Sequence, residues 1–190
     1  MLEPMSPPTL SFSHMGVFVH DLPRMRAFYE RVMGFVVSDE GLIGDALICF
    51  LTRSPDEHHQ LVLMEGRPAG DHFNVVNQIS FRAGALAELR AFYRAMQAEP
   101  GVTHLAGRTH GNAWSVYFRD PEGNRIEVFV DSPWHVAQPI SEPFDILQDD
   151  DAVLAATEAR VKREPSWRPR AEWRAELARR LADRSAPAPG

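Results

Sequence analysis

The sequence has very little cysteine: Cys49 is the sole thiol in 190 residues, so no disulfide can form within the chain. It also lacks any apolar run near the ~20 residues that a membrane-spanning helix needs. Its first residues, MLEPMSPPTL, have neither the charged start nor the apolar core of a signal peptide. Basic residues are in deficit, with 20 Lys and Arg against 26 Asp and Glu. These absences predict a soluble cytoplasmic protein that binds neither nucleic acid nor membrane.

An internal repeat is the most informative feature that is present. The tetrapeptide Arg-Ala-Phe-Tyr occurs at 26–29 and again at 90–93, a spacing of 90 − 26 = 64 residues. The same spacing relates Leu22 to Leu86. Hydrophobic residues make up 44 % of the chain, which indicates a globular protein. A repeat in so short a chain predicts two copies of one folding unit, with the tetrapeptide on the packing face of a helix in each copy.

The pattern of strands and helices supports this division. In the first unit, a strand in SFSHMGVFVHDL precedes a helix that Asp21 caps, and strands follow at ALICFL and HQLVLM. In the second unit, a strand in VNQISFRA precedes a helix, a loop, and strands at AWSVYF and RIEVFV, which the turn DPEG joins. We therefore expect an α+β fold of two βαβββ modules, at 11–65 and 74–131, whose sheets line a shared cleft.

The remaining residues differ in character from the two modules. Residues 1–131 are expected to form one domain, and residues 132–190 a helical C-terminal extension. DDDAVLAATEARVKRE begins with acidic and ends with basic residues, as a helix favours, and PRAEWRAELARRLADR has an amphipathic pattern. Two such helices are too small to fold alone. We expect them to pack on the core or on a second subunit of a homodimer.

The repeat also aligns candidate site residues. His14 lies in the first strand of unit one, and adding 64 gives Gln78 in the first strand of unit two. Glu127 interrupts the apolar strand RIEVFV and shares a face with Arg125 and Phe129. A lone carboxylate in such a strand is costly to bury unless it is paired or bound to metal. The polar cluster at 58–60 occupies the last strand of unit one, so these side chains are expected to converge in one cleft.

Residues 12–131 resemble the vicinal oxygen chelate superfamily, which includes glyoxalase I, fosfomycin-resistance enzymes, bleomycin-binding proteins and extradiol dioxygenases. The stretches that carry the resemblance are HMGVFVHDLPRMRAFYERVMGF, NQISF and SVYFRDPEGNRIEVF. The resemblance implies that Glu127 and His14 are metal ligands. It places a third ligand at Gln78, where the family usually has histidine.

Two further details are similar to extradiol dioxygenases. EHHQLVL resembles a strand that supplies an acid–base histidine, which is His59 or His58 here. HGNAWSVYF resembles a stretch that supplies a histidine and a tyrosine near the bound catechol, here His110 and Tyr117. The resemblance thus implies an enzyme that cleaves a catechol-type aromatic diol with O2, using Fe(II), or alternatively Mn, Ni or Zn.

Several alternatives stay open. Gln78 is a metal ligand or a neighbour of one, or His58 or His59 supplies the missing nitrogen, or the site has lost its metal. If Gln60 matches Glu127 in the repeat, strand alternation places His58 on the inward face, whereas the family resemblance favours His59. The functional alternatives are a glyoxalase-like metal-dependent lyase or isomerase, and a metal-free small-molecule binding protein of the bleomycin-resistance type.

Overall fold

Each half of the chain forms a sheet that carries one helix, in the computed structural model, which describes residues 11–70 and 76–185. The first sheet has the strand order β1-β4-β3-β2 and the second the order β10-β6-β7-β8-β5. The elements of the first half are β1 (Met15–Val19), α1 (Leu22–Arg31), β2 (Val36–Ile43), β3 (Ala46–Thr52) and β4 (Leu61–Glu65). Those of the second are β5 (Ile79–Arg82), α2 (Leu86–Gln97), β6 (Thr103–Thr109), β7 (Ala113–Arg119) and β8 (Arg125–Asp131).

The two halves have the same topology, which confirms the α+β fold of paired βαβββ modules. In each, the first strand pairs in parallel with the last: β1 with β4, and β5 with β8. The other strands of each module pair antiparallel. The repeated tetrapeptide packs as expected, because Phe28 and Tyr29 are buried, and Phe92 and Tyr93 pack against the same core.

The strands β2 and β6 are absent from the sequence-based expectation, which left β2 unassigned and placed a loop over β6. Seven of the eight residues of β2 are exposed, and β6 reads THLAGRT. Neither sequence alternates between apolar and polar residues, so their extended form comes from pairing with β3 and β7.

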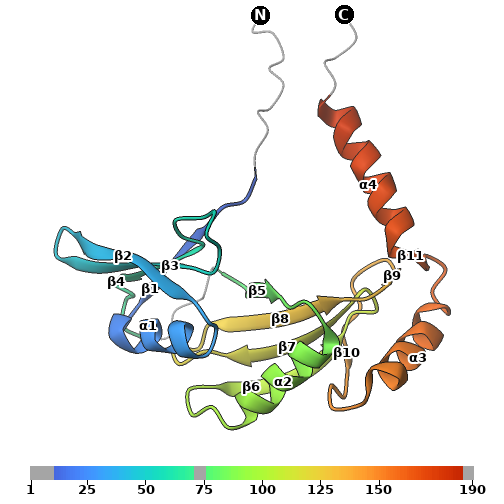
Figure 1. The fold of residues 1–190 in the computed structure, drawn as a ribbon, viewed down its shortest axis with the longest axis horizontal. Helices are drawn as coiled ribbons and strands as arrows, with labels where there is room; N and C mark the ends of the chain where they lie inside the picture. The colour runs from blue at the N-terminus through green and yellow to red at the C-terminus, as the bar shows by residue number, and fades with distance from the viewer. Residues whose placement is uncertain (1–10, 71–75, 186–190) are drawn as a thin grey trace, which may run out of the picture.

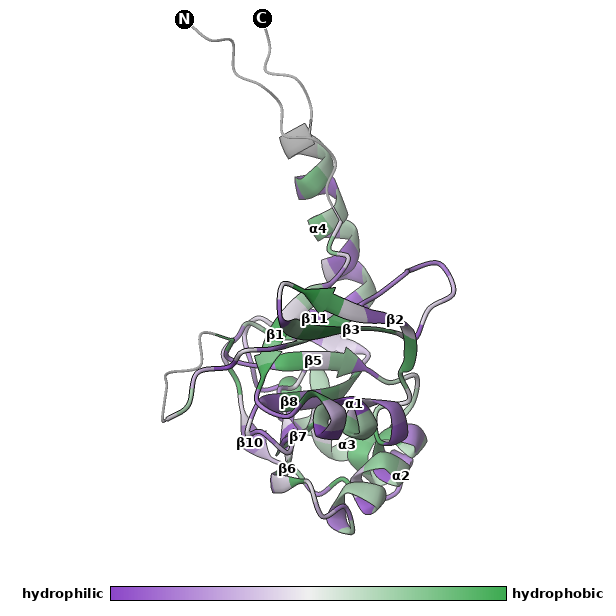
Figure 2. Ribbon diagram, turned by 90° about the vertical axis from the view of Figure 1, so that its left-hand side faces the viewer, coloured by the Kyte–Doolittle hydropathy of each residue, from purple (hydrophilic) through white to green (hydrophobic). Residues whose placement is uncertain are grey.

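The C-terminal residues continue from β8 and cover part of the second sheet (Figure 1). Their elements are β9 (Trp134–His135), β10 (Glu142–Pro143), α3 (Asp150–Val161), β11 (Arg168–Pro169) and α4 (Arg170–Ser185). β10 adds to the edge of β6, and β11 pairs with β9. α4 extends away from the sheets and mixes hydrophobic with hydrophilic residues (Figure 2). Across the described ranges, no helix is long and apolar enough to cross a membrane.

Candidate functional site

A buried carboxylate lies at the centre of the candidate site in the second module. Glu127 on β8 is 7 % exposed, and its Oε2 accepts hydrogen bonds from Gln78 Nε2 at 2.8 Å and from Ser80 Oγ at 2.6 Å. Gln78 lies one residue before β5, and Ser80 lies within it, so strand alternation places both on the same face. These neutral donors offset part of the cost of burying the charge.

Tyr117 and His110 complete this cluster. Tyr117 is directly opposite Glu127 in the β7–β8 ladder. Burial, and then hydrogen bonding to Glu127, raise the pKa of Tyr117, so its phenol keeps its proton at neutral pH. His110 Nε2 lies 3.1 Å from the Tyr117 hydroxyl and 3.7 Å from Glu127 Oε1. The cluster therefore joins an acid, a phenol and an imidazole over one face of the sheet.

The C-terminal residues determine how His110 presents its ring. His110 Nδ1 lies 2.6 Å from the carbonyl oxygen of Ile140, which can only accept a hydrogen bond. Nδ1 must therefore carry a hydrogen, and in the neutral imidazole the free lone pair is on Nε2, which faces Tyr117 and Glu127. This arrangement can take up a proton at Nε2 and release it again.

The structure separates three of the candidates from this cluster. His14 is exposed, lies one residue before β1, and its ring centroid is 4.2 Å from that of His59. His58 Nδ1 and His59 Nδ1 are 2.8 Å apart. Burial, together with the neighbouring His14 and His58, lowers the pKa of His59. Three histidines thus gather on module one, whereas Gln78, His110, Tyr117 and Glu127 gather on module two.

The implied metal site does not fit this geometry. Gln78 turns its amide nitrogen, and not its oxygen, toward Glu127, and Glu127 Oε2 is already engaged by two donors. His14 contacts His59 and Ser13 instead of Glu127. In the part of the chain that the structure describes, no three His, Cys, Asp or Glu side chains are grouped so that they could hold a metal ion.

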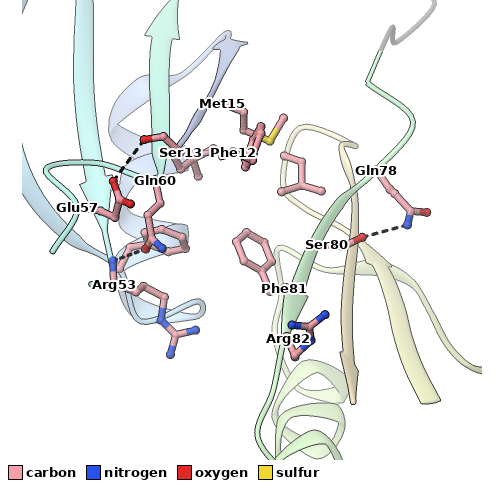
Figure 3. A pocket seen from close by; sticks show the side chains of 13 residues that line it. Phe12, Ser13, Met15, Arg53, Glu57, Gln60, Gln78, Ser80, Phe81 and Arg82 are labelled. Carbon is pink, nitrogen blue, oxygen red and sulfur yellow. Dashed lines mark hydrogen bonds between the residues drawn. The ribbon is translucent and has the colours of Figure 1, made fainter. Parts of the chain in front are cut away.

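Two cavities lie beside the cluster: a larger one is lined by Gln78 and a smaller one by Glu127. The larger, of about 720 Å³, lies between the modules and corresponds to the predicted cleft. Figure 3 shows Arg53, Glu57 and Gln60 on one of its sides and Gln78 and Ser80 on the other. The smaller, of about 310 Å³, contains Glu127 and His110 and is walled by residues of the C-terminal region. The acid and imidazole of the cluster therefore face the smaller cavity.

Sequence reasoning missed two contributors to this cluster. Ser80 was not proposed, although its place two residues after Gln78 in a strand is a usable signal. Ile140, which directly precedes the segment SEPFD, contributes only a backbone carbonyl, so its residue type carries no signal for the contact with His110.

The paired modules and the inward-facing cluster define a protein of the glyoxalase fold. A family model described as the glyoxalase/bleomycin resistance protein/dioxygenase superfamily matches residues 11–128. The chain belongs to this superfamily, whose description includes dioxygenases.

Two relatives and a solved structure refine the comparison. Over 129 residues the chain is 29 % identical to biphenyl-2,3-diol 1,2-dioxygenase 3 of Rhodococcus globerulus, covering 65 % of each chain. Over 166 residues it is 24 % identical to biphenyl-2,3-diol 1,2-dioxygenase 2 of the same organism, covering 78 % of this chain and 84 % of that one. A glyoxylase/bleomycin resistance protein/dioxygenase domain from Frankia sp. EAN1pec superimposes with a TM-score of 0.53 at 18 % identity, covering 66 % of this chain and 100 % of that chain, which shows the fold alone.

Proposed function

We propose that the chain is an extradiol dioxygenase-like enzyme that cleaves the ring of a catechol-type aromatic diol with O2. The observation that carries the proposal is the hydrogen-bonded cluster of His110, Tyr117 and Glu127 beside a cavity of about 310 Å³. That volume is at the lower end of the range for small-molecule sites. The names of the two Rhodococcus globerulus relatives support the choice of an aromatic diol and of O2.

The protein's own residues supply binding and proton transfer in this proposal. Tyr117 keeps its proton and donates a hydrogen bond, because burial and Glu127 raise its pKa. His110 accepts a hydroxyl proton at Nε2, while the Ile140 carbonyl holds the ring in place through Nδ1. A positioned general base of this kind contributes about 10²–10⁴-fold to a rate. His59, the acid–base residue suggested by the resemblance, stays a prediction, as do a homodimer and a cytoplasmic location.

Fe(II), or another divalent metal such as Mn, Ni or Zn, belongs to the proposal because the resemblance implies it. Superfamily members of the dioxygenase kind are metal enzymes, whereas in this structure Gln78 and Ser80 both donate to Oε2 of Glu127 and His110 Nε2 lies 3.7 Å from Oε1. Metal content and Fe(II) dependence are therefore measured together with activity.

The test combines metal analysis with an activity assay. The full chain is purified anaerobically, its metal content is measured, and it is incubated with Fe(II). Ring cleavage of catechol and of biphenyl-2,3-diol is then followed by absorbance under O2. We expect cleavage by the Fe(II)-treated protein and a loss of about 10²-fold or more in kcat for His110→Asn.

Tyr93→Phe serves as the matched control, because Tyr93 on α2 packs on the core away from the cluster. It should retain the wild-type rate. Equal rates for His110→Asn and wild type would remove His110 from the proton-transfer role. Failure of Fe(II)-treated wild type to cleave either diol would contradict the dioxygenase proposal.

The second candidate is a metal-free small-molecule binding protein, and the hydrogen bonds from Gln78 and Ser80 to Glu127 favour it. These bonds supply Oε2 of the buried carboxylate with two neutral donors in place of a cation. This candidate predicts that catechol binds with the same affinity in the presence and absence of a chelator, and that no ring-cleavage product forms.

A further inference from the structure

The smaller cavity has a basic end that the proposed catalytic cluster does not use. Arg82 Nε lies 3.0 Å from Asp131 Oδ2, and Arg170 donates to the same oxygen at 2.8 Å. All three residues line the cavity. Because two guanidinium groups share one carboxylate, this end carries an excess positive charge, and both arginines have further N–H donors to offer.

The negatively charged end of the cavity is at Glu127, on the same strand as Asp131. Glu127 and Asp131 are four residues apart on β8, which pairs with β7 without a register shift. Their side chains therefore lie on the same face of the strand, and their Cα atoms are about 13 Å apart. His110 stands beside Glu127, and His135 is the other titratable group of the cavity wall. The cavity is thus acidic at one end and basic at the other.

Aromatic side chains line the wall between the two ends. Phe129, Trp134 and Trp173 all contribute to the cavity. Trp134 and Trp173 are half-buried, and the ring of His135 stacks parallel to that of Trp173 at 4.7 Å. Flat, apolar walls of this kind suit an aromatic ring.

Short hydrogen-bonded strands hold the C-terminal part of the wall in place. β11 pairs with β9, so that Arg168 lies opposite His135 and Pro169 opposite Trp134. The backbone N–H of Arg170 also donates to the carbonyl of Pro133 at 2.8 Å. Arg170 and Trp173 are therefore presented by the first turn of α4 from a fixed anchor.

We propose that this cavity binds a hydroxylated aromatic carboxylate. The carboxylate would be held by Arg82 and Arg170, the ring would lie against Trp134 and Trp173, and the hydroxyl groups would reach Glu127 and His110. This deepens the proposed function and rests on it for the role of the hydroxyl groups. Arg82 lies within the matched superfamily segment, whereas Arg170 and the two tryptophans lie in the C-terminal region beyond it.

The test measures binding without turnover. Three probes, 3,4-dihydroxybenzoate, benzoate and catechol, are titrated into the full chain with a chelator present, and tryptophan fluorescence reports occupancy because two tryptophans line the cavity. We expect 3,4-dihydroxybenzoate to bind about tenfold or more tightly than catechol, because guanidinium–carboxylate hydrogen bonds are charge-assisted. Benzoate should bind with intermediate affinity.

Arg170→Gln should weaken binding of 3,4-dihydroxybenzoate by about tenfold and leave catechol unchanged. Its matched control is Arg174→Gln, an exposed arginine one turn further along α4 that does not line the cavity. Arg82→Gln repeats the test from β5, and circular dichroism confirms folding of each variant. Equal affinity of wild type for the acid and for catechol would overturn the proposal, as would equal losses for both probes in Arg170→Gln and Arg82→Gln.

The subsite and the proposed function fail separately. A preserved preference for the acid without any ring cleavage would contradict the dioxygenase function and support the subsite. Ring cleavage of catechol together with equal binding of both probes would support the function and contradict the subsite.

Discussion

At the scale of one residue, Gln78 determines which groups stand beside the buried Glu127 carboxylate. The 64-residue offset placed Gln78 opposite His14, and strand alternation turned it toward Glu127, which it contacts at 2.8 Å. The offset could not show that His14 would lie against His59, because that contact comes from the pairing of β1 with β4 inside the first module. Alternation gives the face of a strand on which a side chain lies, whereas strand pairing decides which side chains meet there.

Replacing Gln78 by histidine tests whether this position belongs to a metal site. Gln78→His places an imidazole beside Glu127 in place of an amide that donates to it. Because imidazole is a better ligand for Fe(II) than an amide, we expect tighter Fe(II) binding than in wild type, by about tenfold or more. Anaerobic titration with Fe(II) measures the change.

Gln97→His is the control, since Gln97 ends α2 in an exposed position. It adds a histidine without placing it near Glu127, so its Fe(II) affinity should equal that of wild type. Equal or weaker binding by Gln78→His would show that Gln78 lies outside any metal site of this protein.

At the scale of elements, helices and buried strands were predictable and exposed strands were not. The amphipathic pattern located α1, α2, α3 and α4, and apolar runs located β3, β4, β7 and β8. β2 is exposed along nearly its whole length and β6 carries few apolar residues, so only their partners make them strands. The pairing of β10 with β6 was also invisible, because two residues give no periodicity.

The hairpin between β6 and β7 packs tightly against the C-terminal region at Gly111. Gly111 has φ +74°, and a Cβ there would lie 2.8 Å from Val136 Cγ2 and 3.0 Å from Val161 Cγ1. Gly111→Ala therefore adds a steric clash to the backbone strain of a positive φ. We expect urea unfolding to show a loss of about 2–4 kcal/mol.

Gly123→Ala separates the two causes. Gly123 has φ +82°, but a Cβ there would meet nothing within 4 Å, so this variant carries the strain alone, about 1–2 kcal/mol. The excess destabilisation of Gly111→Ala over Gly123→Ala measures the contact with the C-terminal region. Equal losses in both variants would mean that the region does not pack against the hairpin.

At the scale of the whole molecule, the turn between β7 and β8 joins the two modules. Glu122 accepts hydrogen bonds from the backbone N–H groups of His20 and Asp21, with the shortest contacts at 2.8 Å. Its carboxylate also lies 3.4 Å from Arg67 Nη1, and Tyr29 donates to Asp120 at 3.2 Å. The DPEG sequence predicted the turn, but no local pattern indicated that its two acids would bind the other module.

The contacts of Glu122 should therefore decide whether the modules unfold together. The Glu122 side chain is 4 % exposed, and Glu122→Ala leaves the two N–H groups before α1 without this acceptor. We expect the variant to lose about 2–4 kcal/mol of unfolding free energy.

Two spectroscopic probes report on different parts of the chain. All four tryptophans, at 114, 134, 167 and 173, follow the first module, so their fluorescence reports the second module and the C-terminal region. Far-ultraviolet circular dichroism reports both halves. In wild type the two urea transitions should coincide, and in Glu122→Ala they should separate.

Glu158→Ala is the control, because it breaks only an exposed ion pair with Lys162 on α3. It should cost about 0.5 kcal/mol of stability or less and keep the two transitions together. If the two variants lose the same stability and both keep coincident transitions, Glu122 does not join the modules, and their cohesion must come from the apolar core that they share.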